Sequence, residues 1–356
     1  MAFFSRSAAA ARHVVFLLTL SVASVVGVHT THAQSDWNVT KIDGREYVTV
    51  ENVKKFYGFH TATREGNTIT LSSVTVDPAD KTKRKGALMK LQIGSQECLL
   101  NNVKFIFTYG VEPGGSLGLI SRMDLAKLID PVLRPNFIPN AENFKTVILD
   151  AGHGGKDPGA TNPLGTEAAY NLGLAFRVKK LLESSGFKVV LTRTSDQYLS
   201  LQQRVDLANA VRDEAIFISL HFNSGGRDAR GIETFTLSPP GVAHYGREVN
   251  ASDATARRGN EHDSANIALA TSIHGCILRE LKQNTFDRGI KRARFSVLSG
   301  VRHPAILFEG GFMSHPYEAR LINDERYQTL VAKGIHEAVQ KYRFAVTRKA
   351  VAKSEP

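Results

Sequence analysis

The sequence predicts an α/β fold: a mostly parallel central sheet with helices on both faces, preceded by a small α+β domain. After residue 145, short apolar runs alternate with helix-like stretches, which is typical of strands joined by crossover helices. Before residue 135, strand-like runs are separated by turn residues. A stretch rich in proline and asparagine, "RPNFIPNAENF", separates the two patterns.

The first domain is predicted to span 38–135. In "REYVTVENVKKFYGF" we expect a short strand and then an amphipathic helix, and in "NTITLSS" and "LMKLQIGSQECLLNNVKFIF" strands with turns at "GS" and "NN". "SRMDLAKLIDPVLRP" predicts a helix that Ser121 or Asp124 could cap, with Pro131 near its end. These elements make a small α+β unit.

After a linker at 136–144, the second domain is predicted over 145–342, followed by a flexible tail at 343–356. We expect strands in "TVILDA", "FKVVLTR", "AIFISLHFN", "IETFTLS" and "AILFEGGF". Helices are expected at 167–184, 199–213, 264–283 and 316–342, with Gly186 ending the first of them.

Residues 1–33 have the order of a secretory signal peptide. Two arginines without an acidic residue precede the apolar run "VVFLLTLSVASVVGV", and small residues follow up to Ala33, where we expect cleavage. The alternative is an uncleaved membrane anchor. No other segment is apolar enough to span a bilayer, so the sequence predicts an exported protein of the periplasm or cell envelope, without an integral span after cleavage.

Composition and charge restrict the class further. The chain of 356 residues is 42% hydrophobic and 22% charged, as globular proteins are. Its net charge of +11 favours anionic partners. The basic residues are scattered and no nucleic-acid motif is present, so we expect no nucleic-acid partner. The two cysteines, Cys98 and Cys276, are expected to be buried thiols rather than a disulfide.

Polar residues follow or interrupt three of the apolar strands. In open α/β sheets, ligands bind beyond the carboxyl ends of the strands. These ends carry His153, His221 and Glu309, and Glu167 begins the helix after the first strand. Each has a plainer interpretation: a core histidine, half of a buried ion pair, or a charge favourable at a helix N-terminus. Together they favour a metal, because an unpaired buried carboxylate is costly.

Two histidines and one carboxylate with an open fourth position form a catalytic zinc site. A second carboxylate beside a water molecule can act as general base. The residue types at the strand ends supply both the metal ligands and the general base. Their spacing in the sequence is weakly specific, however, and no H-E-x-x-H motif occurs.

Four segments resemble the zinc-dependent N-acetylmuramoyl-L-alanine amidases of the type-3 family. They are "VILDAGHGGKDPGA", "TEAAYNLGLA", "VVLTRTSDQYLSLQQRVDLANAVRDEAIFISLHFNS" and "AILFEGGFMSHPYEARLI", in that order over about 145–342. The resemblance implies Zn²⁺ held by His153, Glu167 and His221, with Glu309 as general base. It implies cleavage of the amide between N-acetylmuramic acid and L-alanine in peptidoglycan. It is also compatible with a protein partner that activates the enzyme.

The first domain resembles the small N-terminal domain of some copper amine oxidases. "DGREYVTVENVKKFYGF" and the ending "LQIGSQECLLNN…DLAKLIDPVLRP" carry this weaker likeness, which implies no copper. Two alternatives to the amidase stay open: another zinc amide hydrolase, such as a peptidase or a deacetylase, and an inactive protein that binds or activates at the wall.

The segment 239–266 is long, polar and rich in glycine and arginine, as lids and binding loops often are. The alternatives are a disordered insertion and an autoinhibitory helix. We predict that it shapes the substrate groove, with Arg257 and Arg258 meeting carboxylates of the substrate.

Overall fold

The computed structural model describes residues 37–78, 80, 84–139, 141 and 143–347. The predicted signal peptide at 1–33 lies outside these residues, as do residues 348–356 of the predicted tail. From Trp37 onward the chain forms one compact unit. Among the described residues, no helix has both the length and the apolar character that crossing a bilayer requires.

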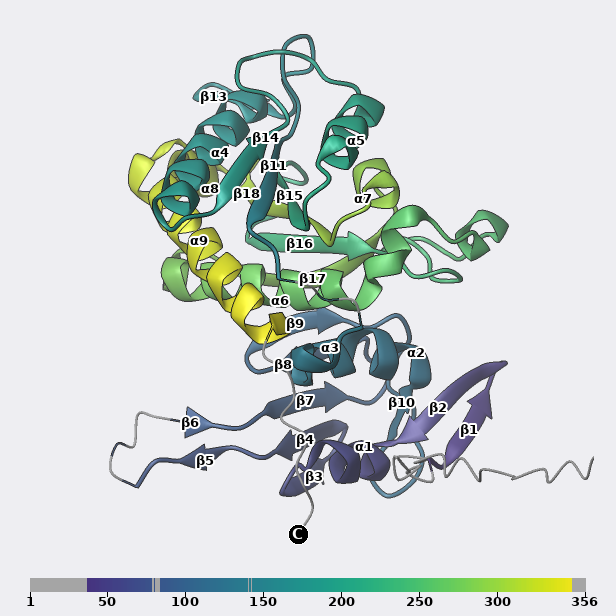
Figure 1. The fold of residues 1–356 in the computed structure, drawn as a ribbon. Helices are drawn as coiled ribbons and strands as arrows, with labels where there is room; N and C mark the ends of the chain where they lie inside the picture. Colours follow the sequence, from purple (N-terminus) through teal and green to yellow (C-terminus); the bar gives the residue numbers. More distant parts are fainter. Residues whose placement is uncertain (1–36, 79, 81–83, 140, 142, 348–356) are drawn as a thin grey trace, which may run out of the picture. The chain divides into compact units, whose positions relative to one another are not determined.

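Eleven strands of the described residues form one continuous sheet, in the order β14-β11-β15-β18-β16-β17-β9-β8-β7-β4-β3 (Figure 1). Its first six strands come from residues 146–312: β14 (Lys188–Leu191), β11 (Thr146–Ala151), β15 (Ala215–Asn223), β18 (Ala305–Phe312), β16 (Ile232–Leu237) and β17 (Asp287–Ala293). The other five come from the first half: β9 (Val103–Ile106), β8 (Glu97–Leu100), β7 (Leu88–Gln92), β4 (Thr68–Ser72) and β3 (Thr61–Glu65).

The prediction of an α/β fold is confirmed, but the prediction of a mostly parallel sheet is not. Strands β14, β11, β15 and β18 are parallel neighbours, whereas β16 runs antiparallel to β18. Strand β17 is parallel to both β16 and β9, through Ile290 and Phe105 in the second case. From β9 outward every pairing is antiparallel. The sheet is mixed because hairpin strands of the first half extend it at β17.

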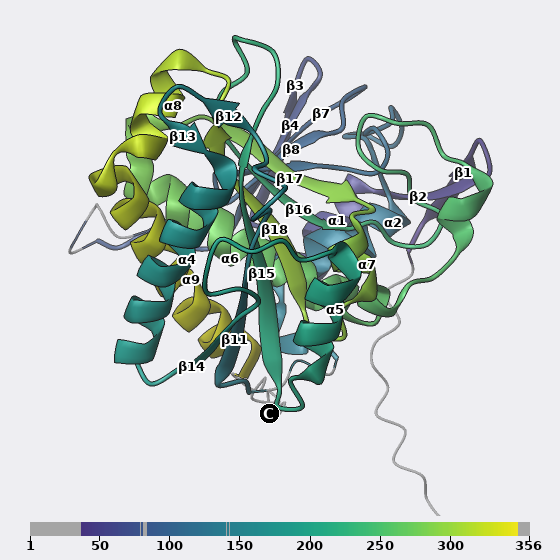
Figure 2. The same ribbon diagram turned by 90° about the horizontal axis from the view of Figure 1, so that it is seen from above.

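Helices cover both faces of the sheet, as predicted. In β11, Val147 and Leu149 belong to one hydrophobic core and Ile148 to another, because successive side chains of a strand point to opposite faces. Figure 2 shows α4, α6 and α9 on one side and α5 and α7 on the other. Their bounds are α4 (Glu167–Ser184), α5 (Leu201–Ala210), α6 (Asp263–Leu281), α7 (Ser296–Gly300), α8 (Pro316–Asn323) and α9 (Glu325–Thr347).

The helix predicted at 316–342 is two helices, because the backbone of Asp324 between α8 and α9 is extended. Helix α9 continues to Thr347, beyond the predicted end of the second domain. Gly186 has a left-handed φ of +80° just after α4, as a helix-ending glycine requires. Cys98 and Cys276 are both buried and free, which confirms two buried thiols.

The first half of the chain adds a second, three-stranded sheet, in which β2 (Arg45–Thr49) lies between β1 (Val39–Ile42) and β10 (Leu119–Ser121). Thr49 caps α1 (Val50–Tyr57), and Ser121 caps the helical segment that follows β10. That segment consists of α2 (Arg122–Asp124), η1 (Leu125–Ile129) and α3 (Asp130–Leu133), followed by η2 (Pro135–Phe137). The remaining short elements are β5 (Thr75–Val76), β6 (Arg84–Lys85), β12 (Thr161–Asn162), β13 (Gly165–Thr166), η3 (Ala251–Ala254), η4 (Arg258–His262) and η5 (Lys282–Asn284).

Candidate metal centre

Three parallel strands bring the predicted site residues to one edge of the sheet. His153 follows β11 by two residues, His221 lies near the end of β15, and Glu309 lies opposite His221 in β18. Glu167 is the first residue of α4, whose N-terminus Thr166 caps by accepting a hydrogen bond from the backbone of Ala169. These side chains therefore lie on neighbouring elements, although Glu309 lies within β18 rather than at its end.

His153, Glu167 and His221 converge closely enough to hold a metal ion. One ligand atom from each lies within 4.8 Å of the other two. Oε1 of Glu167 is 3.2 Å from Nε2 of His153 and 2.8 Å from Nδ1 of His221. Two imidazoles and one carboxylate are the donor set of a catalytic zinc site.

Hydrogen bonds within this group favour the charged forms of its members. Burial opposes ionisation of Glu167, but hydrogen bonds with His153 and His221 outweigh it and hold the pKa of Glu167 well below its usual value. The hydrogen bond to Glu167 raises the pKa of His153. On the other side of the ring, Nδ1 of His153 lies 2.9 Å from a carboxylate oxygen of Asp157, which orients the imidazole.

The surroundings of Glu309 test whether the site fits a cation. Its Oε2 is buried and has no hydrogen-bond partner among the described residues. Burial, and then the charges of Glu167 and Glu233, raise the pKa of Glu309 well above its usual value. A buried, unpartnered carboxylate beside the ionised Glu167 is unfavourable unless a positive charge joins them. The four side chains therefore fit a divalent cation.

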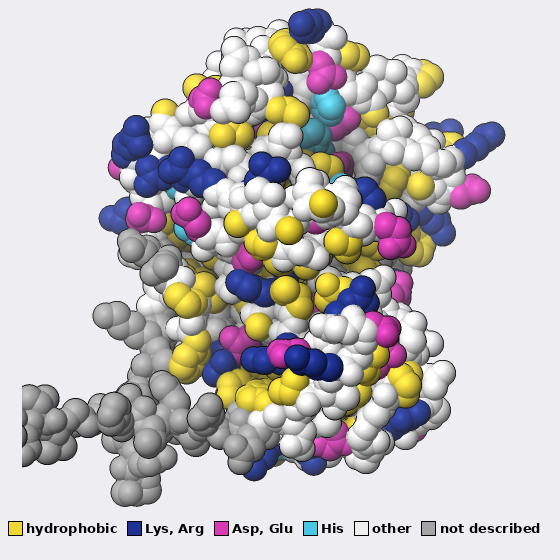
Figure 3. Space-filling view, turned by 90° about the vertical axis from the view of Figure 1, so that its right-hand side faces the viewer, with side chains coloured by type: hydrophobic (Ala, Val, Ile, Leu, Met, Phe, Trp, Pro, Cys, Tyr) yellow, Lys and Arg dark blue, Asp and Glu magenta, His cyan; other side chains and the backbone are white. Residues whose placement is uncertain are grey.

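A cavity of about 390 Å³ opens over this group. His153, His221 and Glu309 line it, together with the aromatic rings of Tyr198 and Phe295. Figure 3 shows histidine and acidic side chains together in a hollow of the surface. The candidate site is thus open to the surface.

Two buried arginines, which sequence reasoning missed, hold the metal-binding loop. Arg193 donates to the carbonyls of Ala151, Gly152 and Ala168, the last of which follows Glu167 directly. Arg204 donates to the carbonyl of His153.

This support matters because His153 has a left-handed φ of +60°, which costs energy in a residue other than glycine. Arg204 also pairs with buried Asp150 in β11. An aspartate inside an apolar strand indicates a buried partner, but it does not identify which residue that partner is.

The other residues predicted to meet substrate lie elsewhere. Arg257 and Arg258 are exposed and do not line the metal-site cavity. They belong to the segment 239–266, which contains the short helices η3 and η4. Its Asp253 is fully buried and pairs with Arg247 and Arg294, so these contacts order the segment.

Comparison with known proteins identifies the family. A family model of N-acetylmuramoyl-L-alanine amidases (Amidase_3) matches residues 147–341. The chain belongs to this family.

Individual relatives match a similar share of the chain. The chain is 33% identical over 198 residues to the uncharacterized protein YqiI of Bacillus subtilis, covering 56% of this chain and 84% of that protein. It is 30% identical over 217 residues to the N-acetylmuramoyl-L-alanine amidase AmiC of Neisseria meningitidis, covering 55% of this chain and 52% of AmiC.

Among solved structures, the catalytic domain of CwlV, an amidase from Bacillus (Paenibacillus) polymyxa, is 32% identical, with a TM-score of 0.46 over 56% of this chain and 97% of that domain. The family match begins at residue 147, so the likeness of 38–135 to copper amine oxidase domains stays a prediction.

Proposed function

We propose that the chain is a zinc-dependent N-acetylmuramoyl-L-alanine amidase that hydrolyses the bond between N-acetylmuramic acid and L-alanine in peptidoglycan. The observation that carries the proposal is the convergence of His153, Glu167 and His221 beside the unpartnered carboxylate of Glu309. Family membership points to the same bond.

His153, Glu167 and His221 would hold the zinc ion. Zinc bound there would act as a Lewis acid that polarises the scissile carbonyl and lowers the pKa of water. Asp157 would keep the His153 ring in place, and Arg193 and Arg204 would fix the loop that carries it.

Glu309 would act as general base and then as general acid. Its carboxylate would take a proton from the attacking water and give it to the departing nitrogen of L-alanine. A base must be ionised, and burial disfavours the ionised form of Glu309, so we expect it to work only with a cation beside it. The cavity above it would admit a glycan strand with its peptide.

We further propose that the protein works in the cell envelope, as the predicted signal peptide implies. Activation by a protein partner, which the resemblance allows, is compatible with this function. The ordered contacts of Asp253 weigh against a disordered insertion at 239–266.

The test combines metal content with product analysis. Purified protein incubated with sacculi should release peptides that begin with a free L-alanine amine, detected by mass spectrometry, and should contain one zinc per chain. Release of acetate instead would identify a deacetylase, and cleavage within the peptide a peptidase. Intact sacculi after incubation with the zinc-loaded protein would refute an active enzyme.

Two variants assign the roles. His153→Ala should lose zinc and activity together. Glu309→Gln should keep zinc and the fold but lose turnover by roughly 10²–10⁴-fold, because it removes only the proton acceptor. Near wild-type turnover in Glu309→Gln would exclude Glu309 as the base.

A further inference from the structure

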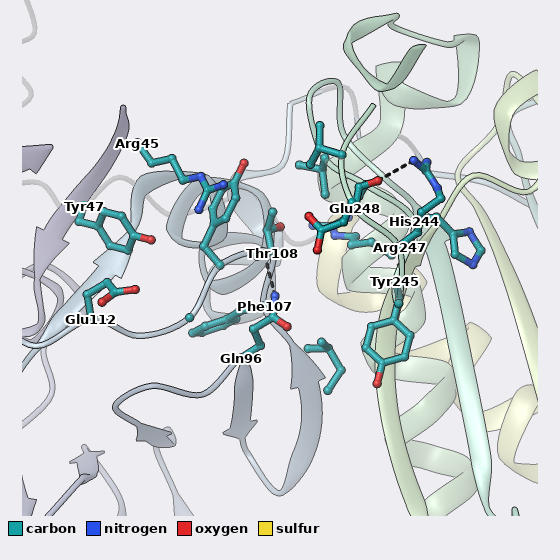
Figure 4. Close-up of a pocket in the computed structure, with 18 residues that line it drawn as sticks. Arg45, Tyr47, Gln96, Phe107, Thr108, Glu112, His244, Tyr245, Arg247 and Glu248 are labelled. Atoms are coloured by element: carbon teal, nitrogen blue, oxygen red, sulfur yellow. Dashed lines mark hydrogen bonds between the residues drawn. The ribbon is translucent and has the colours of Figure 1, made fainter. Parts of the chain in front are cut away.

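A second cavity, larger than the one at the metal site, lies where the first half of the chain meets the segment 239–266. Its volume is about 530 Å³. Residues of β2, the stretch after β9 and the segment 242–249 line it, and Arg292 of β17 contributes from the main sheet. Figure 4 shows labelled side chains from both halves around this space, with Arg45 and Tyr47 on one side and Tyr245 and Arg247 on the other.

The cavity contains a guanidinium group with unused hydrogen-bonding capacity. Arg292 is 5% exposed and donates from its two terminal nitrogens to Thr236, Leu237 and Lys127. Its buried Nε has no acceptor among the described residues. A buried donor without a partner is costly, so an acceptor from a ligand would be favourable here.

A second arginine, Arg45, also lines the cavity. Arg45 is exposed and lies 4.2 Å from the ring centre of Tyr109. This stacking fixes the plane of its guanidinium while leaving a positive charge at the cavity. Arg247 differs, because Asp253 already pairs with it at 2.7 Å. Arg45 and Arg292 together favour a carboxylate.

Other lining groups suit the remainder of a peptide. Tyr245 is exposed and offers aromatic surface and a hydroxyl group, while Glu112 and Glu248 offer acceptors for amide or amino hydrogens. Because side chains of both signs line the cavity, it favours a ligand that carries both signs over a simple anion.

The second cavity and the metal-site cavity share a wall. His244 lines the second cavity and makes an edge-to-face contact, with ring centres 5.5 Å apart, with Phe295, which lines the metal-site cavity. Arg294 also lines the metal-site cavity and donates to the carbonyl of Val242, at the start of the second cavity's wall. The two cavities are therefore adjacent.

We propose that this cavity is a second peptidoglycan-binding site, which takes a carboxylate-bearing stem peptide next to the one being cleaved. The proposal rests on the proposed function, because it takes the substrate to be a polymer that repeats such peptides. The site holds the strand while the metal centre acts on it.

The experiment measures binding without turnover. Glu309→Gln protein is mixed with purified sacculi, and the dissociation constant is obtained from the unbound fraction. In that background, Arg45→Ala and Tyr245→Ala, on opposite walls, should each weaken binding about five- to tenfold. Arg64→Ala removes the same charge from exposed β3, outside the cavity, and should stay within twofold of the parent.

Competition identifies the ligand. Soluble stem peptides should displace the parent from sacculi, and glycan strands stripped of peptides should not. Displacement by bare glycan, or unchanged binding in both cavity variants, would overturn the proposal. Failure of the wild-type protein to cleave sacculi would instead overturn the proposed function, so the two failures are distinguishable.

Discussion

Gly152→Ala tests whether the close packing of the metal-binding loop on His221 controls zinc affinity. A Cβ at Gly152 would lie 2.2 Å from Cε1 and 2.3 Å from Nε2 of the His221 ring. Gly152 does not have a left-handed backbone, so alanine would be strained by lack of space alone. The substitution therefore acts directly on one predicted ligand.

The required displacement is large for a metal site. Ordinary contacts of a Cβ atom begin at 3.4 Å, so the His221 ring would have to withdraw by about 1.2 Å. Metal–ligand distances tolerate only about 0.2 Å. We expect the zinc dissociation constant of Gly152→Ala to rise at least ~100-fold, which corresponds to about 2.8 kcal/mol.

The assay is competition with a chromophoric zinc chelator, with unfolding followed in parallel. Gly173→Ala is the matched control: its added methyl, inside α4, would meet only Oε1 of Gln328 at 3.6 Å. That variant should keep its zinc affinity and gain about 0.5–1 kcal/mol in free energy of unfolding, since alanine favours a helix. A zinc affinity of Gly152→Ala within threefold of the parent would refute the reasoning.

Two further predictions concern the supporting arginines and pH. Arg193→Met removes the donors to three carbonyls around the candidate site. Denaturant titrations should show a free energy of unfolding lower by about 3 kcal/mol. The control Arg177→Met loses a surface ion pair with Glu325 and should lower it by under ~1 kcal/mol. Equal losses of unfolding free energy in the two variants would show that Arg193 does not support the loop that carries His153. The pKa values of His153 and Glu309 are raised, so zinc binding competes with protons at this site. Zinc affinity should therefore rise with pH, and calorimetry in different buffers should show proton release. A pH-independent affinity would contradict this.

The sequence was sufficient to predict that these side chains converge, because the relevant order is local. Apolar strands end at fixed points, and parallel neighbours place those ends together. His153, His221 and Glu309 needed only that rule. Glu167 lies at a helix N-terminus that could be recognised from its sequence, and the structure begins α4 at that residue.

The arginine network could not be found in the same way. Arg193 and Arg204 act through backbone carbonyls that are far from them in sequence. Nothing in the local pattern distinguishes a buried arginine from an exposed one, because only the folded loop supplies its acceptors. The strained φ of His153, which these arginines support, is equally invisible in the sequence.

Strand β17 shows why the sheet was predicted incorrectly. Its sequence, "DRGIKRA", contains four charged residues and reads as a loop. In the fold, Lys291 pairs with buried Glu233 at 2.7 Å, and Asp287 pairs with His274 at 2.9 Å. These partners make a charged strand stable in the interior, and none of them is adjacent in sequence. Without β17, the strands of the first half had no edge to join.

The charged side chains that made the sequence of β17 resemble a loop also connect the two cavities. Glu233, which Lys291 neutralises, lies opposite Glu309 across β16 and β18, so β17 contributes to the electrostatics of the metal centre. The next residue of the strand, Arg292, reaches the second cavity, and Arg294, just after its end, joins the segment 239–266 to the metal-site wall. An apolar strand would pair as well but could make none of these contacts. The polar character of β17 therefore links the first half of the chain to the metal centre.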